Sequence, residues 1–374
     1  MTYDIIVVGA GVVGLAHAYT AARRGLKVLV IERDAACAGA SVRNFGFVTV
    51  TGQRAGAHWQ RAMRSRELWA AIAPQAGIEV LHSGLWLAAR RPAAHAVLEA
   101  FMQTGMASGC ELLTPQAAAA RHPALRTAGL QSVLYSPHEL RVESRTAIPR
   151  LARWLAEAHG VDFRFGEAVL EVAPPRVRTV RATYAAERVV VCTNADPGSL
   201  YAPEWAAHGL RQCQLQMLRV RPQAGFELKG SVMGDLSLVR YEGYSALEPA
   251  QVLREQLQNE EHESLAHGIH LIVVQSADGS LVVGDSHHYG TPGGPAPAPF
   301  AQERVDALIL RHLCEALQLS EASVVERWVG SYPVSPAEPC IVQAPDDATR
   351  LVAVTSGSGA STALGLAEEV LSTW

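Results

Sequence analysis

The chain has 374 residues, of which 49% are hydrophobic and 18% charged, and its formal net charge is −4. This balance is ordinary for a globular protein and gives no reason to expect nucleic acid or an anionic membrane surface as a partner. The length favours two domains over a single compact core.

The chain begins with a strand, a glycine-rich turn and a helix. Ile5 to Val8 form the short apolar run of a buried parallel strand, and 12–24 is predicted as a helix. Between them, Gly9, Gly11 and Gly14 match the spacing G-x-G-x-x-G. In that pattern the glycines permit a tight turn, close approach of the backbone to a pyrophosphate, and close packing of helix on strand. The helix N-terminus then offers N–H groups to phosphates.

A second strand is predicted over 27–31, and Glu32 closes it. Glu32 lies roughly 20 residues beyond the glycines, where this arrangement places a carboxylate that holds ribose hydroxyls. The glycines alone are also compatible with an ordinary turn. Because strand, glycines, helix, strand and acid agree, the sequence predicts a dinucleotide site.

Several later segments, separated by long stretches of sequence, are predicted to belong to the same domain. After an irregular glycine- and hydroxyl-rich loop over 40–53, the pattern predicts helices over 57–72 and from 144, strands at 161–165, 168–172, 189–192 and 351–354, and a final helix from about Thr362. The intervening sequence predicts strands over 214–220, 270–276 and 280–286, an exposed helix over 250–263, and a turn-rich linker over 292–300. The dinucleotide domain is therefore expected to consist of three separated segments.

The six cysteines are scattered and contain no C-x-x-C pair. This pattern argues against a disulfide framework or a cysteine metal site, so we expect no metal and a reducing, cytoplasmic environment. No apolar run has the length of a membrane-spanning helix, so we expect no integral membrane association.

The order of these elements resembles the superfamily of FAD-dependent D-amino-acid oxidases, glycine oxidases and sarcosine oxidases. The resemblance rests on the glycine fingerprint with Glu32, on the C-terminal glycine loop, and on the stretches ERVVVCTNAD, ADGSLVVGDS and WVGSYPVSPAEPCIV. It implies an α/β fold in which a glutathione-reductase-like FAD-binding Rossmann domain carries an inserted α+β substrate domain built on an antiparallel sheet. The expected FAD-binding segments are 1–80, 142–210 and 325–374, and the expected substrate-domain segments are 81–141 and 211–324.

The resemblance also implies which residues bind FAD. Glu32 would bind the adenosine ribose, Val169 would contact adenine through its backbone, and the loop from Ser41 to Gly46 would pass the pyrophosphate and the isoalloxazine. The C-terminal loop would face the flavin pyrimidine, where a helix N-terminus suits the negative charge of the reduced ring. Ser361 and Thr362 could also serve as ordinary N-capping residues of the last helix, and that role is compatible with facing the flavin. The complete expected set is Gly9, Gly11, Gly14, Glu32, Arg33, Ser41, Asn44, Val169, Gly357, Ser358, Gly359, Ala360, Ser361 and Thr362.

Three departures from these relatives refine the expectation. Sarcosine oxidases bond their flavin through a cysteine, and Gly330 stands at the matching position here, so we expect noncovalent FAD. Tyr332 stands where glycine oxidase-like relatives carry a carboxylate-binding arginine, which makes ordinary α-amino acids doubtful substrates. Several sarcosine oxidase relatives place a lysine near the flavin to assist its reaction with oxygen, but the C-terminal loop here has no basic residue, and Lys27 and Lys229 are the only lysines. The electron acceptor, molecular oxygen or another compound, therefore stays open.

The stretches ASVRNFGF and GDSHHYG look like those of proposed aminophosphonate oxidoreductases. This implies a small amine substrate related to 2-aminoethylphosphonate, and Arg43, His287 and Tyr332 are the substrate-binding candidates because guanidinium, imidazole and hydroxyl groups suit a phosphonate. Each has a structural alternative: Arg43 pairing with the FAD pyrophosphate, His287 and His288 capping a turn, and Tyr332 as a core aromatic.

The expected reaction is oxidation of a C–N bond by hydride transfer to flavin N5, followed by hydrolysis of the imine. It needs no acid–base pair, and none is evident in the sequence. One alternative is a glycine, sarcosine or D-amino-acid oxidase. Another is a 2-hydroxy acid or glycerol phosphate dehydrogenase, in which His270, His287 or His288 would remove the hydroxyl proton. A protein that binds FAD without turnover and a nicotinamide dehydrogenase are more distant alternatives.

Overall fold

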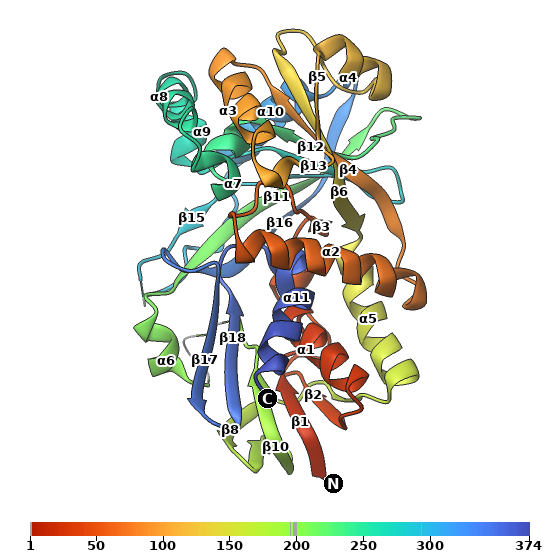
Figure 1. The fold of residues 1–374 in the computed structure, drawn as a ribbon, viewed down its shortest axis with the longest axis vertical. Helices are drawn as coiled ribbons and strands as arrows, with labels where there is room; N and C mark the ends of the chain where they lie inside the picture. The colour runs from red at the N-terminus through yellow and green to blue at the C-terminus, as the bar shows by residue number, and fades with distance from the viewer. Residues whose placement is uncertain (1, 195, 197–199, 293) are drawn as a thin grey trace.

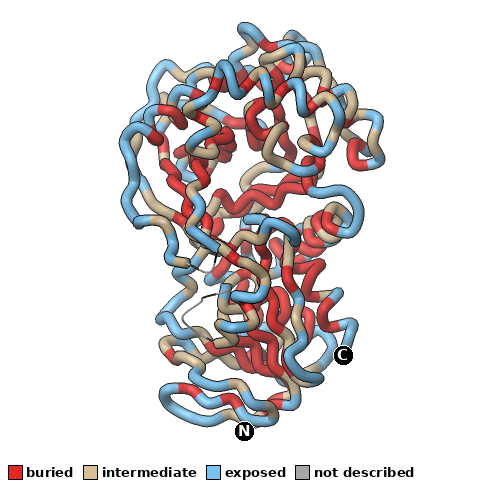
Figure 2. The backbone as a smooth tube through the Cα atoms, turned by 90° about the vertical axis from the view of Figure 1, so that its left-hand side faces the viewer, coloured by how far each residue is buried: buried red, intermediate tan, exposed pale blue. Residues whose placement is uncertain are grey.

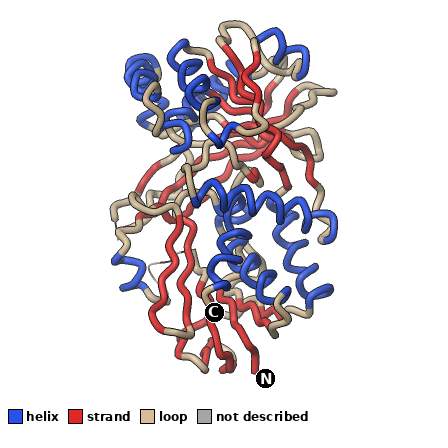
Figure 3. The backbone as a smooth tube through the Cα atoms, viewed as in Figure 1, coloured by secondary structure: helices blue, strands red, loops and turns tan. Residues whose placement is uncertain are grey.

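The computed structural model describes residues 2–194, 196, 200–292 and 294–374. Two large sheets, each covered by helices, occupy the two halves of an elongated molecule (Figures 1 and 3). Both halves have buried chain segments at their centres (Figure 2). Among the described residues, no helix is both long and apolar enough to span a membrane.

The first sheet contains the predicted strand–turn–helix unit. Its strand order is β17-β18-β10-β1-β2-β7, and every neighbouring pair is parallel except β17 with β18. A hairpin of β8 and β9 extends from β10. The bounds are β1 (Thr2–Val8), β2 (Val28–Ile31), β7 (Asp162–Arg164), β8 (Val169–Ala173), β9 (Arg176–Thr179), β10 (Thr183–Val191), β17 (Cys340–Asp346) and β18 (Thr349–Val354).

Both faces of β1 are buried, which explains its continuous apolar run. Ile5 and Val7 pack toward a core that includes residues of α1 (Val12–Arg23), α5 (Ser144–His159) and α11 (Gly359–Ser372). Ile6 and Val8 point the other way, into a core that includes Trp205 of α6 (Ala202–Ala207). Successive side chains of a strand alternate between faces, so each face needs its own cover.

The second sheet has the order β15-β11-β14-β13-β12-β4-β6-β3, with β16 beside β11 and β5 beside β6. Its pairs are antiparallel except β4 with β12, so the expected antiparallel substrate sheet is present. The bounds are β3 (Phe47–Val48), β4 (Val80–Ala89), β5 (Glu111–Leu113), β6 (Ser132–Val142), β11 (Arg211–Pro222), β12 (Ser231–Gly234), β13 (Ile272–Gln275), β14 (Leu281–Gly284), β15 (His288–Tyr289) and β16 (Ala322–Val334).

Short helices cover the second sheet, and one long helix lies between the halves. The covering helices are α3 (Pro92–Met102), α4 (Pro115–Arg121), α7 (Glu242–Ser245), α8 (Ala250–Glu260), α9 (His262–Ala266) and α10 (Glu303–Ala316), with 3₁₀ turns η2 (Gly105–Ala107) and η3 (Asp235–Val239). A further 3₁₀ turn, η1 (Ala40–Val42), lies in the loop after β2. Helix α2 (Ala57–Gln75) crosses the middle of the molecule against α11 (Figure 1). A Cβ at Gly365 would lie 2.8 Å from the Arg61 carbonyl oxygen, so glycine permits this close crossing.

The observed boundaries correct several predictions. Helix α11 begins at Gly359 rather than about Thr362, and the helix predicted over 250–263 breaks at Glu261 into α8 and α9. It is also not wholly exposed, because Leu253 and Leu257 are buried in the substrate-side core. β3 and most of β16 pair in the second sheet although they fall within the segments predicted for the FAD domain. The exact domain limits stay a prediction.

Candidate active site

A cavity of about 910 Å³ lies where the first sheet ends against the second. Its lining includes Val8, Ile31 and Cys192, at or just beyond the carboxyl ends of three parallel strands of the first sheet. The opposite wall includes Leu215 of β11 and Tyr332 of β16. The carboxyl edge of a parallel sheet and the junction of two domains are both usual places for a ligand site.

The glycine turn has the geometry that the fingerprint predicts. Gly9 has φ +104°, and a Cβ there would lie 2.6 Å from the Cys192 carbonyl oxygen. A Cβ at Gly14 would lie 1.9 Å from the Gly9 carbonyl oxygen, so α1 can pack on the turn only without a side chain there. Gly11 lines the cavity, and a Cβ there would lie 3.1 Å from the Ser41 hydroxyl oxygen, so its missing side chain leaves room for Ser41 at the start of α1.

Glu32 stands at the end of β2 and is held by backbone groups on two sides. Its Oε2 accepts from the Ala10 N–H at 2.8 Å and its Oε1 accepts from the Asp34 N–H at 3.0 Å. This fixes a carboxylate beside the glycine turn, on the cavity wall. Arg33 also lines the cavity, but its guanidinium pairs with Asp196 at 2.6 Å.

The loop after β2 crosses the front of the glycine turn. The Ser41 hydroxyl oxygen accepts from the Val12 N–H at 2.9 Å, so Ser41 lies directly at the start of α1. The Asn44 amide is used inside the loop: it donates to the Ala40 carbonyl oxygen and accepts from the Gly46 N–H, both at 2.7 Å. Arg43 lines the cavity, and its carbonyl oxygen accepts from the Trp328 ring N–H at 3.1 Å.

The C-terminal loop closes another wall of the same cavity. Gly357 has φ +72°, and a Cβ there would lie 2.9 Å from the Tyr332 ring, so only glycine lets the ring and the loop meet. The Ser361 hydroxyl accepts from the Thr49 N–H at 2.9 Å and the Thr362 hydroxyl donates to the Ser358 carbonyl oxygen at 2.9 Å. These hydroxyls therefore anchor the loop.

Most of the predicted cofactor residues come together. The cavity lining includes Gly9, Gly11, Glu32, Arg33, Ser41, Asn44, Val169, Gly357, Ser358, Gly359, Ala360 and Ser361, whereas Gly14 and Thr362 support the wall from behind. The glycine turn and the fixed carboxylate of Glu32 suit the dinucleotide part of FAD. The same cavity continues to a polar group of side chains at the substrate sheet, as an FAD site requires. The individual cofactor contacts stay predictions.

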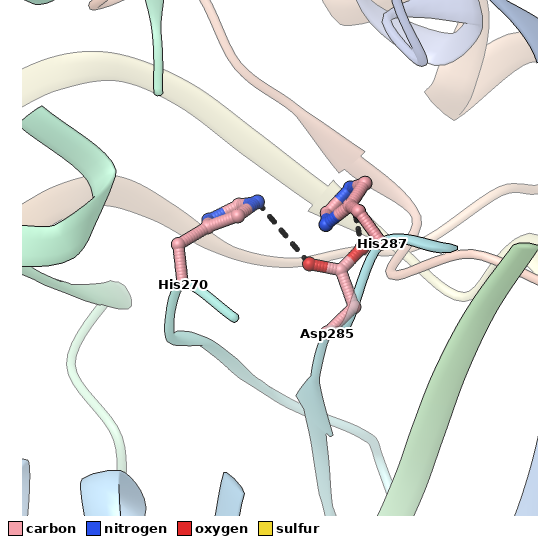
Figure 4. Close-up of side chains that lie close together, drawn as sticks. All are labelled: His270, Asp285 and His287. Carbon is pink, nitrogen blue, oxygen red and sulfur yellow. Dashed lines mark ion pairs between the residues drawn. The ribbon is translucent and has the colours of Figure 1, made fainter. Parts of the chain in front are cut away.

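The second polar end holds three buried side chains that converge (Figure 4). His270, just before β13, and His287, just after β14, flank the carboxylate of Asp285. Their Nε2 atoms lie 3.2 Å from Asp285 Oδ1 and 3.7 Å from Oδ2, respectively. The two rings stack with centroids 5.1 Å apart, and one donor atom from each of the three residues falls within 4.8 Å of the others. The three side chains therefore form one compact buried cluster.

Burial shifts the proton affinities of this cluster. It raises the pKa of Asp285 to about 7, although Arg240 opposes the shift by favouring the ionised carboxylate. Burial, and then Arg240, lower the pKa of both His270 and His287 well below the ordinary value. Both imidazoles are therefore neutral near pH 7, where Asp285 titrates.

A guanidinium occupies the adjacent wall. Arg240 follows η3, and its nitrogens donate to the hydroxyl oxygens of Tyr289 at 3.1 Å and Tyr332 at 3.4 Å. In the described part of the chain, no carboxylate forms an ion pair with it. Burial raises the pKa of Tyr332 well above the ordinary value, so this hydroxyl keeps its proton and can donate it. The wall thus carries a positive charge and two phenol groups.

Sequence reasoning found only part of this end of the cavity. His287 and Tyr332 lie there, and Arg43 lies on the wall next to Gly330. His288 turns away, with its Nε2 3.1 Å from His267 Nδ1. Arg240 was not anticipated, because it follows a short 3₁₀ turn and belongs to no recognisable motif. Asp285 lay inside the quoted stretch GDSHHYG, but its contact with His270 depends on the pairing of β13 with β14.

The fold and cavity define a two-domain dinucleotide-binding protein. A family model described as FAD dependent oxidoreductase (DAO) matches residues 4–372. The chain therefore belongs to the DAO family of FAD-dependent oxidoreductases, and FAD is its cofactor. A search of curated protein sequences finds no match.

Solved structures agree in fold. Glycine oxidase from Geobacillus kaustophilus is 19% identical, with a TM-score of 0.77 over 99% of this chain and 94% of that one. L-proline dehydrogenase from P. horikoshii is 18% identical, with a TM-score of 0.77 over 99% and 92%. L-alpha-glycerophosphate oxidase from Mycoplasma pneumoniae, solved with FAD bound, is 18% identical, with a TM-score of 0.76 over 100% and 95%. At these identities the likeness establishes the shared fold and not the substrate.

Proposed function

We propose that this protein oxidises the C–N bond of a small amine that also carries an anionic group, most specifically an aminophosphonate related to 2-aminoethylphosphonate. The observation that carries the proposal is Arg240, a guanidinium on the cavity wall whose hydrogen-bond partners among the described residues are the two phenol oxygens of Tyr289 and Tyr332. Arg240 is partly buried and has no carboxylate partner among the described residues, so its charge is available to an anion in the cavity. Charge-assisted bonds from guanidinium and hydroxyl groups suit a phosphonate with three oxygens.

Arg240 also changes the argument about carboxylates. Tyr332 replaces the arginine that binds carboxylate in glycine oxidase-like relatives, but its hydroxyl receives a hydrogen bond from Arg240. The cavity therefore has a guanidinium close to the expected position, supplied by another element. Glycine, sarcosine and D-amino acids consequently belong in any substrate test as the nearest alternative.

The family cofactor defines the chemistry, and the chain supplies orientation. When bound, FAD would take up one hydride, which carries both electrons of the oxidation, from the substrate carbon. Arg240, Tyr289 and Tyr332 hold the anionic end, and the buried walls exclude water around the amine. The released imine is hydrolysed to a carbonyl product and an amine or ammonia. Either molecular oxygen or another compound then accepts the electrons.

We further propose that FAD is held without a covalent bond. Gly330 occupies the position of the flavin-linking cysteine of sarcosine oxidases, and a Cβ there would lie only 3.0 Å from the Arg43 carbonyl oxygen. Precipitation of the protein with acid should therefore release all of the yellow colour into the supernatant.

Oxidation of a 2-hydroxy acid or a glycerol phosphate is the second candidate. It is favoured by the position of His270 beside the Asp285 carboxylate, since removal of a hydroxyl proton needs a general base. A histidine next to a carboxylate can serve as that base. Arg240 would bind the carboxylate or phosphate of such a substrate equally well.

Anaerobic titration of the FAD-bound protein separates these candidates. The panel contains 2-aminoethylphosphonate, its hydroxylated and N-methylated forms, glycine, sarcosine, D-alanine, lactate and glycerol 3-phosphate. We expect an aminophosphonate to bleach the oxidised-flavin absorbance. Bleaching by glycine, sarcosine or D-alanine alone would replace the phosphonate assignment by an amino-acid one. Bleaching by the hydroxy compounds alone would overturn amine oxidation.

A further inference from the structure

Asp285 carries a buried oxygen that lacks a hydrogen-bond partner. The residue is 5% exposed, and its Oδ1, although 3.2 Å from His270 Nε2, receives no well-directed hydrogen bond. An unmatched carboxylate oxygen in a buried place costs free energy unless a ligand completes it. Because Asp285 also lines the cavity, a ligand can reach this oxygen.

The neutral imidazole of His287 does not donate a hydrogen bond to Asp285, so the carboxylate can accept one from a ligand. His287 Nδ1 lies 2.9 Å from the Gly268 carbonyl oxygen, which can only accept, so a neutral His287 carries its proton on Nδ1. Its Nε2 is then a bare acceptor that faces Asp285 Oδ2 at 3.7 Å. This unprotonated nitrogen gives the Asp285 carboxylate no hydrogen bond, so a donor for the carboxylate has to come from elsewhere.

Arg240 and Asp285, which carry opposite charges, both line the cavity but form no ion pair with each other in the described part of the chain. Arg240 and Asp285 influence each other's proton affinity, yet within the described residues no ion pair joins them. Both line the same cavity. A ligand with an anionic end for Arg240 and a cationic end for Asp285 would satisfy both groups at once.

We propose that Asp285, supported by His270 and His287, binds the ammonium group of the substrate and removes its proton before the amine is oxidised. This inference rests on the proposed oxidation of an amine. In the step, one N–H bond of R–NH₃⁺ breaks and one O–H bond forms on the Asp285 carboxylate, which gives R–NH₂ and a neutral carboxyl group. No oxidant or reductant takes part, and the free lone pair then assists the loss of hydride from the neighbouring carbon.

The surroundings of Asp285 identify it as the group that titrates near neutral pH. The titratable and charged groups facing it are Arg240 after η3, Tyr241 before α7, His270 before β13, His287 after β14, Cys213 of β11 and Tyr332 of β16. Burial raises the pKa of the Cys213 thiol to about 12 and also raises those of the two tyrosines, whereas it lowers those of the two imidazoles.

The test compares the FAD-bound wild type with Asp285→Asn. The rate of anaerobic flavin reduction by 2-aminoethylphosphonate is measured from pH 6 to 10, and the binding of ethylphosphonate, which lacks the amine, is measured from the flavin spectrum. Asp347→Asn is the matched control, because Asp347 is an exposed acid remote from the cavity lining.

For the wild type we expect second-order reduction to rise with pH and level off above about pH 7. Asp285→Asn should lose about 10²–10⁴-fold at pH 7, the usual contribution of a positioned base. Its rate should keep rising tenfold per pH unit toward the pKa of the free amine, about 10, because only the neutral amine then reacts. Ethylphosphonate binding should change less than threefold, which separates loss of the base from loss of the fold or of the anion site.

Several outcomes would overturn the inference. One is an Asp285→Asn profile that matches the wild type, and another is a stoichiometric divalent metal that the wild type holds and Asp285→Asn lacks. Reduction by hydroxy compounds alone would leave no ammonium for Asp285 to receive. If glycine but no phosphonate reduces the flavin, the phosphonate assignment fails by itself, and the same comparison is made with glycine and acetate.

Discussion

Replacing Asp285 by asparagine should stabilise the folded protein while it damages the reaction. Burial raises the pKa of Asp285 from about 3.8 to about 7. Since the folded pKa is the higher one, stability falls as pH rises between these two values and the whole penalty applies above about pH 7. A shift of roughly 3 units at 1.36 kcal/mol per unit corresponds to about 4 kcal/mol. Asparagine keeps the shape and removes the charge, so the variant escapes this penalty.

The assay is the melting temperature of the FAD-bound protein at pH 5 and pH 8. An unfolding entropy of about 2.1 cal/mol/K per residue makes 1 kcal/mol worth about 1.3 °C in a chain of 374 residues. We therefore expect Asp285→Asn to melt about 5 °C higher than the wild type at pH 8 and only about 2 °C higher at pH 5. Asp347→Asn should show no such pH-dependent gain. A variant that melts lower than the wild type at pH 8 would refute the reasoning, because it would mean that the buried carboxylate is already compensated.

Two other substitutions test the cavity walls. Arg240→Gln should weaken ethylphosphonate binding by about 10- to 100-fold, because one to two charge-assisted hydrogen bonds are lost. The exposed control Arg153→Gln should leave the affinity unchanged. Equal affinities for wild type and Arg240→Gln would remove Arg240 from the anion site. Gly357→Ala combines φ +72° with a Cβ 2.9 Å from the Tyr332 ring, so it should lower FAD occupancy after gel filtration at least several-fold. The matched change Gly105→Ala meets no atom within 4 Å and should retain FAD like the wild type; equal retention by Gly357→Ala would contradict the tight contact.

The cofactor half of the molecule was predictable because its constraints are local in the sequence. Gly9 and Gly14 are needed for contacts within one turn and one helix, and Glu32 is held by backbone groups close to that same turn. Such requirements leave a fixed spacing that is visible in the amino-acid sequence itself. The last helix was also expected, although its start was misplaced by about a turn, because Gly359 reads as a loop residue when considered alone.

The substrate half was less predictable because its contacts join distant segments. Arg240 meets Tyr289 and Tyr332 through side chains from three separate elements, and no local pattern links them. Asp285 reaches His270 only because β13 and β14 pair, which puts the residues that flank this hairpin next to each other. Sequence reasoning named His270 and His287 as possible bases for an alcohol but could not supply the buried carboxylate between them.

Arg240 and Asp285 are best understood as two parts of one binding site. In the ligand-free protein, Asp285 keeps a buried oxygen without a hydrogen-bond donor, which costs stability, and Arg240 keeps a charge without a carboxylate partner among the described residues. Their direct pairing would remove that cost, yet no such pair exists among the described residues. Residues that are kept apart in this way stay available to a ligand with both charges, and part of its binding free energy comes from completing the hydrogen bonding of Asp285. Specificity for a zwitterion would therefore depend on the gap between Arg240 and Asp285, whereas an amine without an anion would satisfy only one of them.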